Sequence, residues 1–191
     1  MNIFKGIDKR RKTVIKQTMG FENKNISIPF HWSGEVLTIT FFCILVLLGT
    51  IIYLGIFKSW PDSVLWLKYL TIIFVSITIV AVGGFMPIRL KANEREIVLC
   101  RMLSSLKIPI NKVVEITPIT SFYIDGSIKT FGSDGMFGYI GNFKNKRLGK
   151  YTMYATELKN LVLVRTTDKT YVFSCTRYRD FISNVEQKRS K

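Results

Sequence analysis

One segment of the chain combines residue types that suit a phosphate-bearing surface. From residue 131 to 150, glycine recurs at every third position from 132 to 141, four aromatic residues lie among the glycines, and four basic residues follow. Glycine allows positive φ and close backbone approach, and aromatic rings beside basic side chains are typical of loops that bind anionic lipid headgroups at a membrane surface. The residues predicted to bind lipid or a partner are Phe137, Tyr139, Lys144, Lys146, Arg147 and Lys150.

The same glycines and aromatic residues also fit a purely structural interpretation. Phenylalanine and tyrosine scattered through a β domain usually fill its core, and glycines within strands often form bulges. The segment contains no G-x-G-x-x-G or phosphate-loop motif that would favour binding. Core packing and a binding loop therefore stay the two alternatives for residues 131–150.

The first 24 residues form a basic arm, in which Lys9, Arg10, Arg11 and Lys12 adjoin apolar residues. Such a segment can form an amphipathic helix on the inner leaflet of a membrane, or it can stay a disordered charged tail. Nucleic acid is not an expected partner, because no nucleic-acid-recognition motif accompanies the basic run.

Motifs for catalysis or metal binding are missing from the sequence. The one histidine, His31, lies between Phe30 and Trp32, a position that suits a ring at a membrane interface. The three cysteines, at positions 43, 100 and 175, form no C-x-x-C pair, and no nucleophile-elbow or metalloprotease motif occurs. The sequence thus predicts a non-catalytic protein without a metal or a cofactor.

Two uncharged apolar runs in the first half of the chain must position the candidate binding residues and the basic arm. They cover residues 36–57 and 69–86, which are 22 and 18 residues long, and neither contains Asp, Glu, Lys, Arg or His. As helices they would extend about 33 Å and about 27 Å, close to the ~30 Å hydrocarbon core of a bilayer. Buried core helices of a soluble protein rarely lack charge all round. The runs therefore predict a two-span transmembrane hairpin.

The distribution of basic residues predicts the orientation of this hairpin. Lys and Arg stay preferentially on the cytoplasmic side of a membrane, and Trp favours its interfaces. The connection at residues 58–68 carries Trp60 and Trp66, whereas Arg89 and Lys91 closely follow the second run. We expect both termini in the cytoplasm and the connection outside.

The overall charge agrees with a membrane protein that faces anionic lipid. The chain has 28 Lys and Arg against 13 Asp and Glu, a formal net charge of +15, yet its mean hydropathy is +0.21. Residues 87–191 hold 19 basic and nine acidic residues, so most of the excess charge lies in the C-terminal part.

This C-terminal part is predicted to be a mainly-β domain closed by a helix. About seven short segments rich in β-branched residues have the pattern of strands. After them, Tyr178, Phe181, Ile182 and Val185 lie at i, i+3, i+4 and i+7, which predicts one amphipathic helix. The predicted domains are a basic cytoplasmic arm at residues 1–35, a transmembrane hairpin at 36–86 and a cytoplasmic β domain at 87–191.

Three stretches of this region resemble one family. Residues 106–116, the glycine-rich residues 132–150 and residues 154–156 look like the bacterial pleckstrin-homology (PH-like) domain family. The resemblance implies a partly open barrel of about seven strands that is capped by the C-terminal helix. It implies no settled activity, because the fold carries many kinds of ligand.

A second basic cluster is suggested by the same resemblance. In lipid-binding PH domains a basic pocket lies near the first two strands, and Lys91, Arg95, Arg101 and Lys107 resemble that arrangement loosely. A solvated basic face that contributes to cytoplasmic retention explains the same residues.

Together these features predict a multi-pass protein of the bacterial cytoplasmic (inner) membrane that presents a PH-like domain as a non-catalytic interaction module. One alternative is a sensor of anionic phospholipid. Another is an accessory subunit of a larger membrane complex, or a homo-oligomer, in which the hairpin is the docking surface. In that case Gly49, Ser76 and Gly83 would mark helix contacts, since small residues allow close approach.

Overall fold

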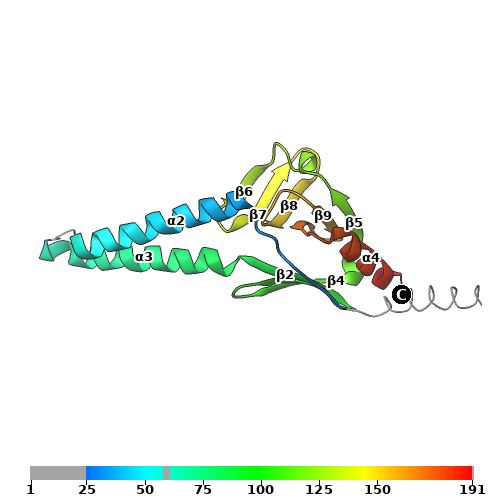
Figure 1. The fold of residues 1–191 in the computed structure, drawn as a ribbon, viewed down its shortest axis with the longest axis horizontal. Helices are drawn as coiled ribbons and strands as arrows, with labels where there is room; N and C mark the ends of the chain where they lie inside the picture. The colour runs from blue at the N-terminus through cyan, green and yellow to red at the C-terminus, as the bar shows by residue number, and fades with distance from the viewer. Residues whose placement is uncertain (1–24, 58–60, 191) are drawn as a thin grey trace, which may run out of the picture.

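The protein consists of two long apolar helices that project from a β domain (Figure 1). The computed structural model describes residues 25–57 and 61–190. The first helix, α2 (Gly34–Ile52), continues into a π-helical turn, η1 (Tyr53–Phe57), and the second, α3 (Leu65–Gly84), follows a short 3₁₀ turn, η2 (Asp62–Val64). The predicted pair of apolar helices is confirmed as secondary structure.

The β domain contains two sheets. The strands are β1 (Ile26–Pro29), β2 (Pro87–Ala92), β3 (Glu96–Arg101), β4 (Ser105–Pro109), β5 (Val113–Ile119), β6 (Ile128–Gly135), β7 (Gly138–Asn145), β8 (Gly149–Ala155), β9 (Leu161–Thr166) and β10 (Thr170–Ser174). Short 3₁₀ turns precede and follow β5, η3 (Ile110–Lys112) and η4 (Ser121–Tyr123), and the described chain ends in helix α4 (Tyr178–Arg189).

The four-stranded sheet has the order β1-β2-β3-β4 and the six-stranded sheet the order β5-β9-β10-β8-β7-β6. All pairings are antiparallel except that of β10 with β8, which is parallel. Nine strands follow the helices, where the sequence predicted about seven, because the glycine-rich segment forms the long hairpin β6–β7.

Strand β1 was not predicted. The sequence assigned residues 1–35 to a basic arm, but Ile26–Pro29 pairs with β2 before the chain enters α2. Ile28 is 1% exposed and Phe30 is 8% exposed. The β domain is therefore built from both sides of the helical pair, and its core is not confined to residues 87–191. The predicted amphipathic helix of the arm lies in residues 1–24, outside the described residues.

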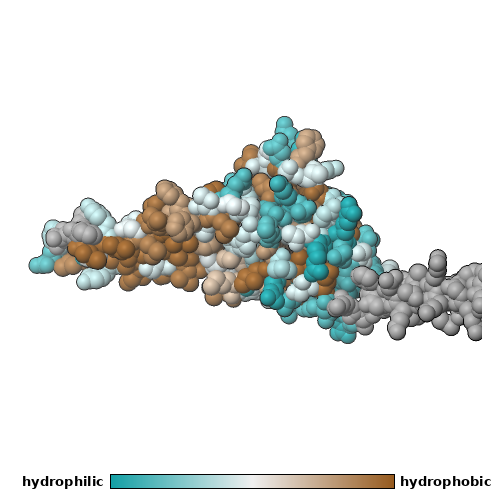
Figure 2. All heavy atoms as spheres, in the orientation of Figure 1, coloured by the Kyte–Doolittle hydropathy of each residue, from teal (hydrophilic) through white to brown (hydrophobic). Residues whose placement is uncertain are grey.

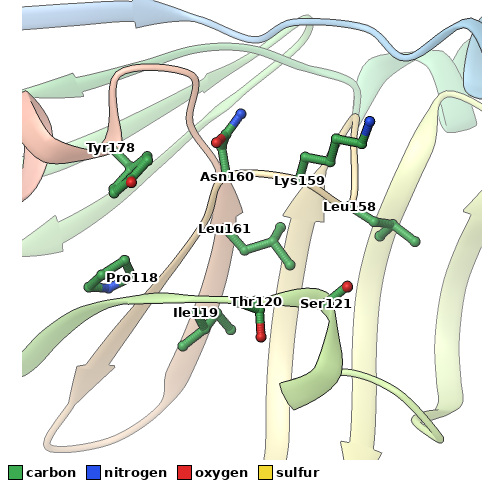
Figure 3. A pocket seen from close by; sticks show the side chains of 9 residues that line it. All are labelled: Pro118, Ile119, Thr120, Ser121, Leu158, Lys159, Asn160, Leu161 and Tyr178. Carbon is green, nitrogen blue, oxygen red and sulfur yellow. The ribbon is translucent and has the colours of Figure 1, made fainter.

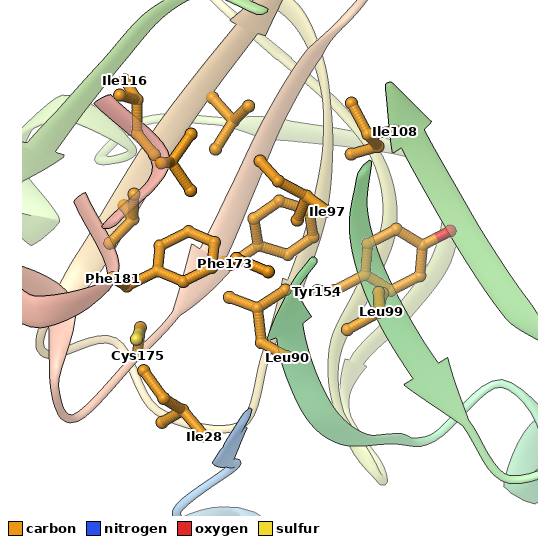
Figure 4. Close-up of a cluster of buried hydrophobic side chains, with 14 of the residues drawn as sticks. Ile28, Leu90, Ile97, Leu99, Ile108, Ile116, Tyr154, Phe173, Cys175 and Phe181 are labelled. Carbon is orange, nitrogen blue, oxygen red and sulfur yellow. The ribbon is translucent and has the colours of Figure 1, made fainter. Parts of the chain in front are cut away.

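The main core lies between the two sheets and under α4 (Figure 4). Phe181 and Val185 of α4 are fully buried, and Tyr178 and Ile182 pack against the same cluster, which confirms the predicted apolar stripe. A smaller cluster around Phe143 lies apart from the main core.

The two long helices expose apolar side chains over almost their whole length (Figure 2). Both are long and apolar enough to cross a membrane, and at most 6% of either apolar window is buried in the protein. Five hydroxyl groups of these helices donate to the carbonyl four residues earlier, which satisfies these donors within the helix as an apolar surrounding requires. These residues are Thr38, Thr50, Thr71, Ser76 and Thr78.

Candidate functional site

The predicted binding residues are divided between the two ends of strand β7. Phe137 lies in the β6–β7 turn, where it is 9% exposed, and Tyr139 is partly buried close by. Lys144, Lys146, Arg147 and Lys150 are exposed at the opposite end, around the β7–β8 turn. The chain therefore does not form a single loop that combines an inserted Phe137 or Tyr139 with the four basic side chains.

The β6–β7 turn packs against the bases of both helices. The buried backbone N–H of Phe137 donates to Oγ1 of Thr40 in α2 at 2.8 Å. A Cβ added to Gly135 would lie 3.3 Å from Cδ1 of Ile39, and one added to Gly83 of α3 would lie 4.0 Å from Cζ of Phe137. The turn thus fixes the six-stranded sheet to the helical pair, which explains why Phe137 is buried.

Further hydrogen bonds join the helices to the domain. At the start of α2, the N–H of Ser33 donates to the carbonyl of Thr156 at 3.2 Å, and Oγ1 of Thr156 donates to the carbonyl of His31 at 2.6 Å. At the end of α3, the N–H of Leu103 donates to the carbonyl of Gly84 at 3.2 Å. No free linker separates the helices from the β domain at either junction.

We use "basic turn" for Lys144, Lys146, Arg147 and Lys150. The guanidinium carbon of Arg147 lies 3.7 Å from the ring centre of Phe122 in η4, and Nη1 donates to the carbonyl of the same residue. Phe122 itself is 62% exposed. An exposed aromatic ring therefore does lie beside the basic side chains, but it belongs to Phe122 and not to the predicted Phe137 or Tyr139.

Asn145 holds this arrangement together. Its Nδ2 donates to the carbonyl of Tyr123 at 2.7 Å, and its Oδ1 accepts from the N–H of Leu148 at 2.7 Å. Tyr123, which is 45% exposed, brings a second ring to the same corner. Sequence reasoning missed Phe122 and Tyr123 because they lie more than twenty residues before the basic turn and show no periodic pattern with it.

Two of the glycines have a structural role. Gly132 and Gly141 face each other across β6 and β7 at φ values of 125° and 133°. A Cβ on Gly132 would lie 2.0 Å from the carbonyl oxygen of Ile140, and one on Gly141 would lie 2.1 Å from that of Phe131. At these positions the close approach of two backbones, rather than a ligand, explains glycine.

The second basic cluster does not converge on a pocket. Arg95 and Arg101 lie at opposite ends of β3, and Lys107 forms a 3.7 Å ion pair with Glu96. Arg101 lies against aromatic rings, with its guanidinium carbon 5.6 Å from the ring centre of Tyr154. Lys91 and Lys107 share one row across β2, β3 and β4, but Arg95 and Arg101 lie away from that row at the two ends of β3, so the four described residues do not gather at one point.

A hollow of about 530 Å³ lies between the end of β5, the β8–β9 connection and Tyr178 of α4 (Figure 3). Lys159 is the only charged residue that lines it. Among the residues that the structure describes, no three His, Cys, Asp or Glu side chains gather in a way that could hold a metal ion.

Burial raises the pKa of the Cys175 thiol to about 11.

Two sheets closed by a C-terminal helix, with a pair of long apolar helices inserted between the first two strands, define the class of this protein as a mainly-β domain joined to a helical pair. Comparison with known families matches residues 88–189 to the Bacterial PH domain, and the chain belongs to that family. PH domains are generally non-catalytic interaction modules. Neither the curated proteins nor the solved structures include a match to this chain.

Proposed function

We propose that this protein is an integral membrane protein that presents its bacterial PH domain as a non-catalytic interaction module at the cytoplasmic surface of the bacterial inner membrane. The observation that carries the proposal is the direct junction between exposed apolar helices and the β domain. Because hydrogen bonds fix both junctions, the domain would have a set height and orientation above the membrane.

The helix dimensions support a membrane span. The candidate spans Gly34–Ile56 and Leu65–Gly84 contain 23 and 20 residues, which correspond to about 34 Å and about 30 Å of helix, enough for a ~30 Å hydrocarbon core. At the far end, Trp66 and Tyr69 are 63% and 60% exposed, as expected for rings in an interfacial belt. Nζ of Lys68 donates to the carbonyl of Gly55 there at 3.1 Å.

The orientation follows from the same charge bias that the sequence shows. The β domain carries most of the basic residues, so we infer that it lies on the cytoplasmic side and that the η1–α3 connection lies outside. Both chain termini are then cytoplasmic.

Crosslinking in cells, followed by detergent extraction and affinity capture, tests the module. Wild-type protein should retain a recurrent membrane or cytoplasmic partner. Serine at Lys146 and Arg147 of the basic turn should lose that partner, whereas serine at Arg95, in the β2–β3 connection, and at Lys112, in η3, should retain it. Identical capture by both variants would contradict a partner site at Lys146 and Arg147, and a protein that alkaline carbonate releases from membranes would contradict the anchor.

A second candidate function is contact with anionic phospholipid, which is favoured by the exposure of all four basic-turn residues. The third candidate, docking of the hairpin in a larger complex or a homo-oligomer, depends on small residues in the helices. Gly49 and Ser76 are exposed and open for such a contact, whereas Gly83 already packs against Phe137.

A further inference from the structure

One face of the six-stranded sheet combines exposed apolar and basic side chains in register. Residues directly opposite each other on neighbouring strands point to the same side of a sheet. Ile128 of β6 is opposite Lys144 of β7, which is opposite Lys150 of β8. One row closer to the β6–β7 turn, Phe131 is opposite Asn142. We call Ile128, Phe131, Lys144 and Lys150 the lateral face.

The lateral face continues the sheet surface on which the helices pack. Beyond Phe131, the next row on the same side contains Ile140 and Tyr154, paired across β7 and β8. Both belong to the main core cluster, and Ile44 of α2 and Val82 of α3 pack against that cluster. The sheet therefore extends past the helices and leaves its outer rows uncovered.

The position of the lateral face relative to a membrane around the helices follows from the β6–β7 turn. The turn lies beside Ile39 and Thr40, at a level where α2 already exposes Leu37 at 52% and Phe41 at 70%. Phe131 is four residues from Gly135, at most about 13 Å along the strand. Figure 1 shows β6 and β7 at the end of the domain where the helices join. If the hairpin spans a membrane, the row of Phe131 lies near the headgroup layer, and the row of Ile128, Lys144 and Lys150 continues the same side of the sheet beyond it.

The composition of the face fits an anionic lipid surface. Phe131 is 77% exposed, more than any other large apolar side chain in the described part of the chain, and Ile128 is 72% exposed. β6 is also an edge strand whose first five residues are all exposed. The acidic residue of this strand, Asp134, is opposite Tyr139 and so lies on the other side of the sheet. Apolar side chains beside lysines favour insertion between anionic headgroups.

We propose that the lateral face binds the headgroup layer of the inner leaflet, with Phe131 and Ile128 inserted among the lipids and with Lys144 and Lys150 against their phosphates. The proposal rests on the membrane span proposed above. It differs from the predicted lipid loop, because Phe131 takes the place of Phe137 or Tyr139 as the inserted ring and the contact extends along an edge strand. The domain would then lie flat against the membrane on one side and expose its remaining surface to partners.

The test uses the full chain in lipid nanodiscs. Cys43 and Cys100 are replaced by alanine, while Cys175, which is 2% exposed, is retained. An environment-sensitive fluorophore is attached at Phe131→Cys or, as the matched control, at Val114→Cys. Val114 is 53% exposed, and its carbonyl accepts a hydrogen bond from Arg189 at the C-terminal end of α4. Figure 1 shows α4 on the side of the domain opposite the long helices.

With phosphatidylglycerol in the nanodisc, the probe at 131 should show a blue-shifted emission and strong quenching by spin-labelled lipid, and the probe at 114 should show neither. Serine at both Lys144 and Lys150 should reduce the blue shift, whereas serine at Arg95 and Lys112 should leave it unchanged. The same water-like emission at 131 and 114 would overturn the proposal. A blue shift that occurs only in nanodiscs with two copies of the chain would also overturn it, because a second copy would then cover the face.

Carbonate extraction of the same preparations separates this failure from failure of the proposed function. Protein that resists extraction but has a water-like probe at 131 keeps its anchor and loses the lateral-face contact. Protein that carbonate releases has no membrane span, and both proposals fail together.

Discussion

Ile28→Ala tests whether the short strand before the helices is part of the domain core. Ile28 is 1% exposed and lies in the main cluster, opposite Leu90 of β2. It belongs to a segment that the sequence placed in a basic arm, so the substitution separates the two descriptions. If β1 were a tail, truncation of one side chain would have little effect.

The expected cost follows from the burial. Isoleucine loses three carbon atoms on truncation to alanine, worth about 2.4 kcal/mol at about 0.8 kcal/mol per buried CH₂ group. A residual cavity adds to this value, since the two sheets can close only partly over the space. We expect a loss of about 3–4 kcal/mol in the free energy of unfolding, within the usual range for this substitution.

Equilibrium unfolding in urea, with the protein in mild detergent, measures this loss. The micelle protects the apolar helices, so the transition reports the β domain. Ser27→Ala is the matched control, because Ser27 is exposed on the same strand, and alanine keeps the backbone carbonyl that accepts from Arg177 at 3.3 Å. Equal urea midpoints for Ile28→Ala and Ser27→Ala would refute the assignment of β1 to the core.

Three further predictions follow from particular contacts. Thr40→Val removes the acceptor of the buried Phe137 N–H and should cost about 1–3 kcal/mol, with faster hydrogen exchange in the β6–β7 turn than in the control Thr38→Val. Gly141→Ala should disrupt the β6–β7 hairpin, because its Cβ would lie 2.1 Å from a carbonyl oxygen, whereas Gly149→Ala, with open space at its Cβ, should cost only about 1–2 kcal/mol of backbone strain; equal urea midpoints would contradict this. Burial raises the pKa of Cys175 from 9.0 to about 11, so the folded state binds the thiol proton more tightly than the unfolded state does. The resulting stabilisation of the folded state is present below pH 9 and is lost as the pH rises toward 11. The loss is on the order of 2–3 kcal/mol, and Cys175→Ala should flatten that part of the stability profile; an unchanged slope would show that Cys175 ionises normally.

The elements with strong local patterns could be predicted from the sequence. The charge-free runs predicted both long helices, and the spacing of Tyr178, Phe181, Ile182 and Val185 predicted α4 with its buried face. The resemblance of the C-terminal region predicted the family, which the match over residues 88–189 confirms. Insertion into a membrane and the orientation of the hairpin stay predictions, because they depend on a lipid phase as well as on the chain.

The parts that could not be predicted depend on contacts between distant segments. Strand β1 has four residues, and its partner β2 begins 58 residues after its last residue, so no local pattern reveals the pairing. Phe137 was expected at a membrane surface but is buried, because the β6–β7 turn meets α2, whose Thr40 precedes Phe137 by 97 residues. The ring beside Arg147 belongs to Phe122 for the same reason. Local periodicity contains no information about such long-range packing.

Accessibility of introduced cysteines in intact bacterial cells tests the central claim most directly. Ser63→Cys, in the exposed connection between the helices, and Lys169→Cys, in the exposed β9–β10 turn, are treated with a membrane-impermeant thiol reagent in a chain whose Cys43 and Cys100 are alanine. We expect labelling of Ser63→Cys in intact cells and of Lys169→Cys only after the membrane is opened. Labelling of Lys169→Cys in intact cells would contradict a cytoplasmic PH domain, and protection of Ser63→Cys until the cells are opened would contradict a hairpin that crosses the membrane.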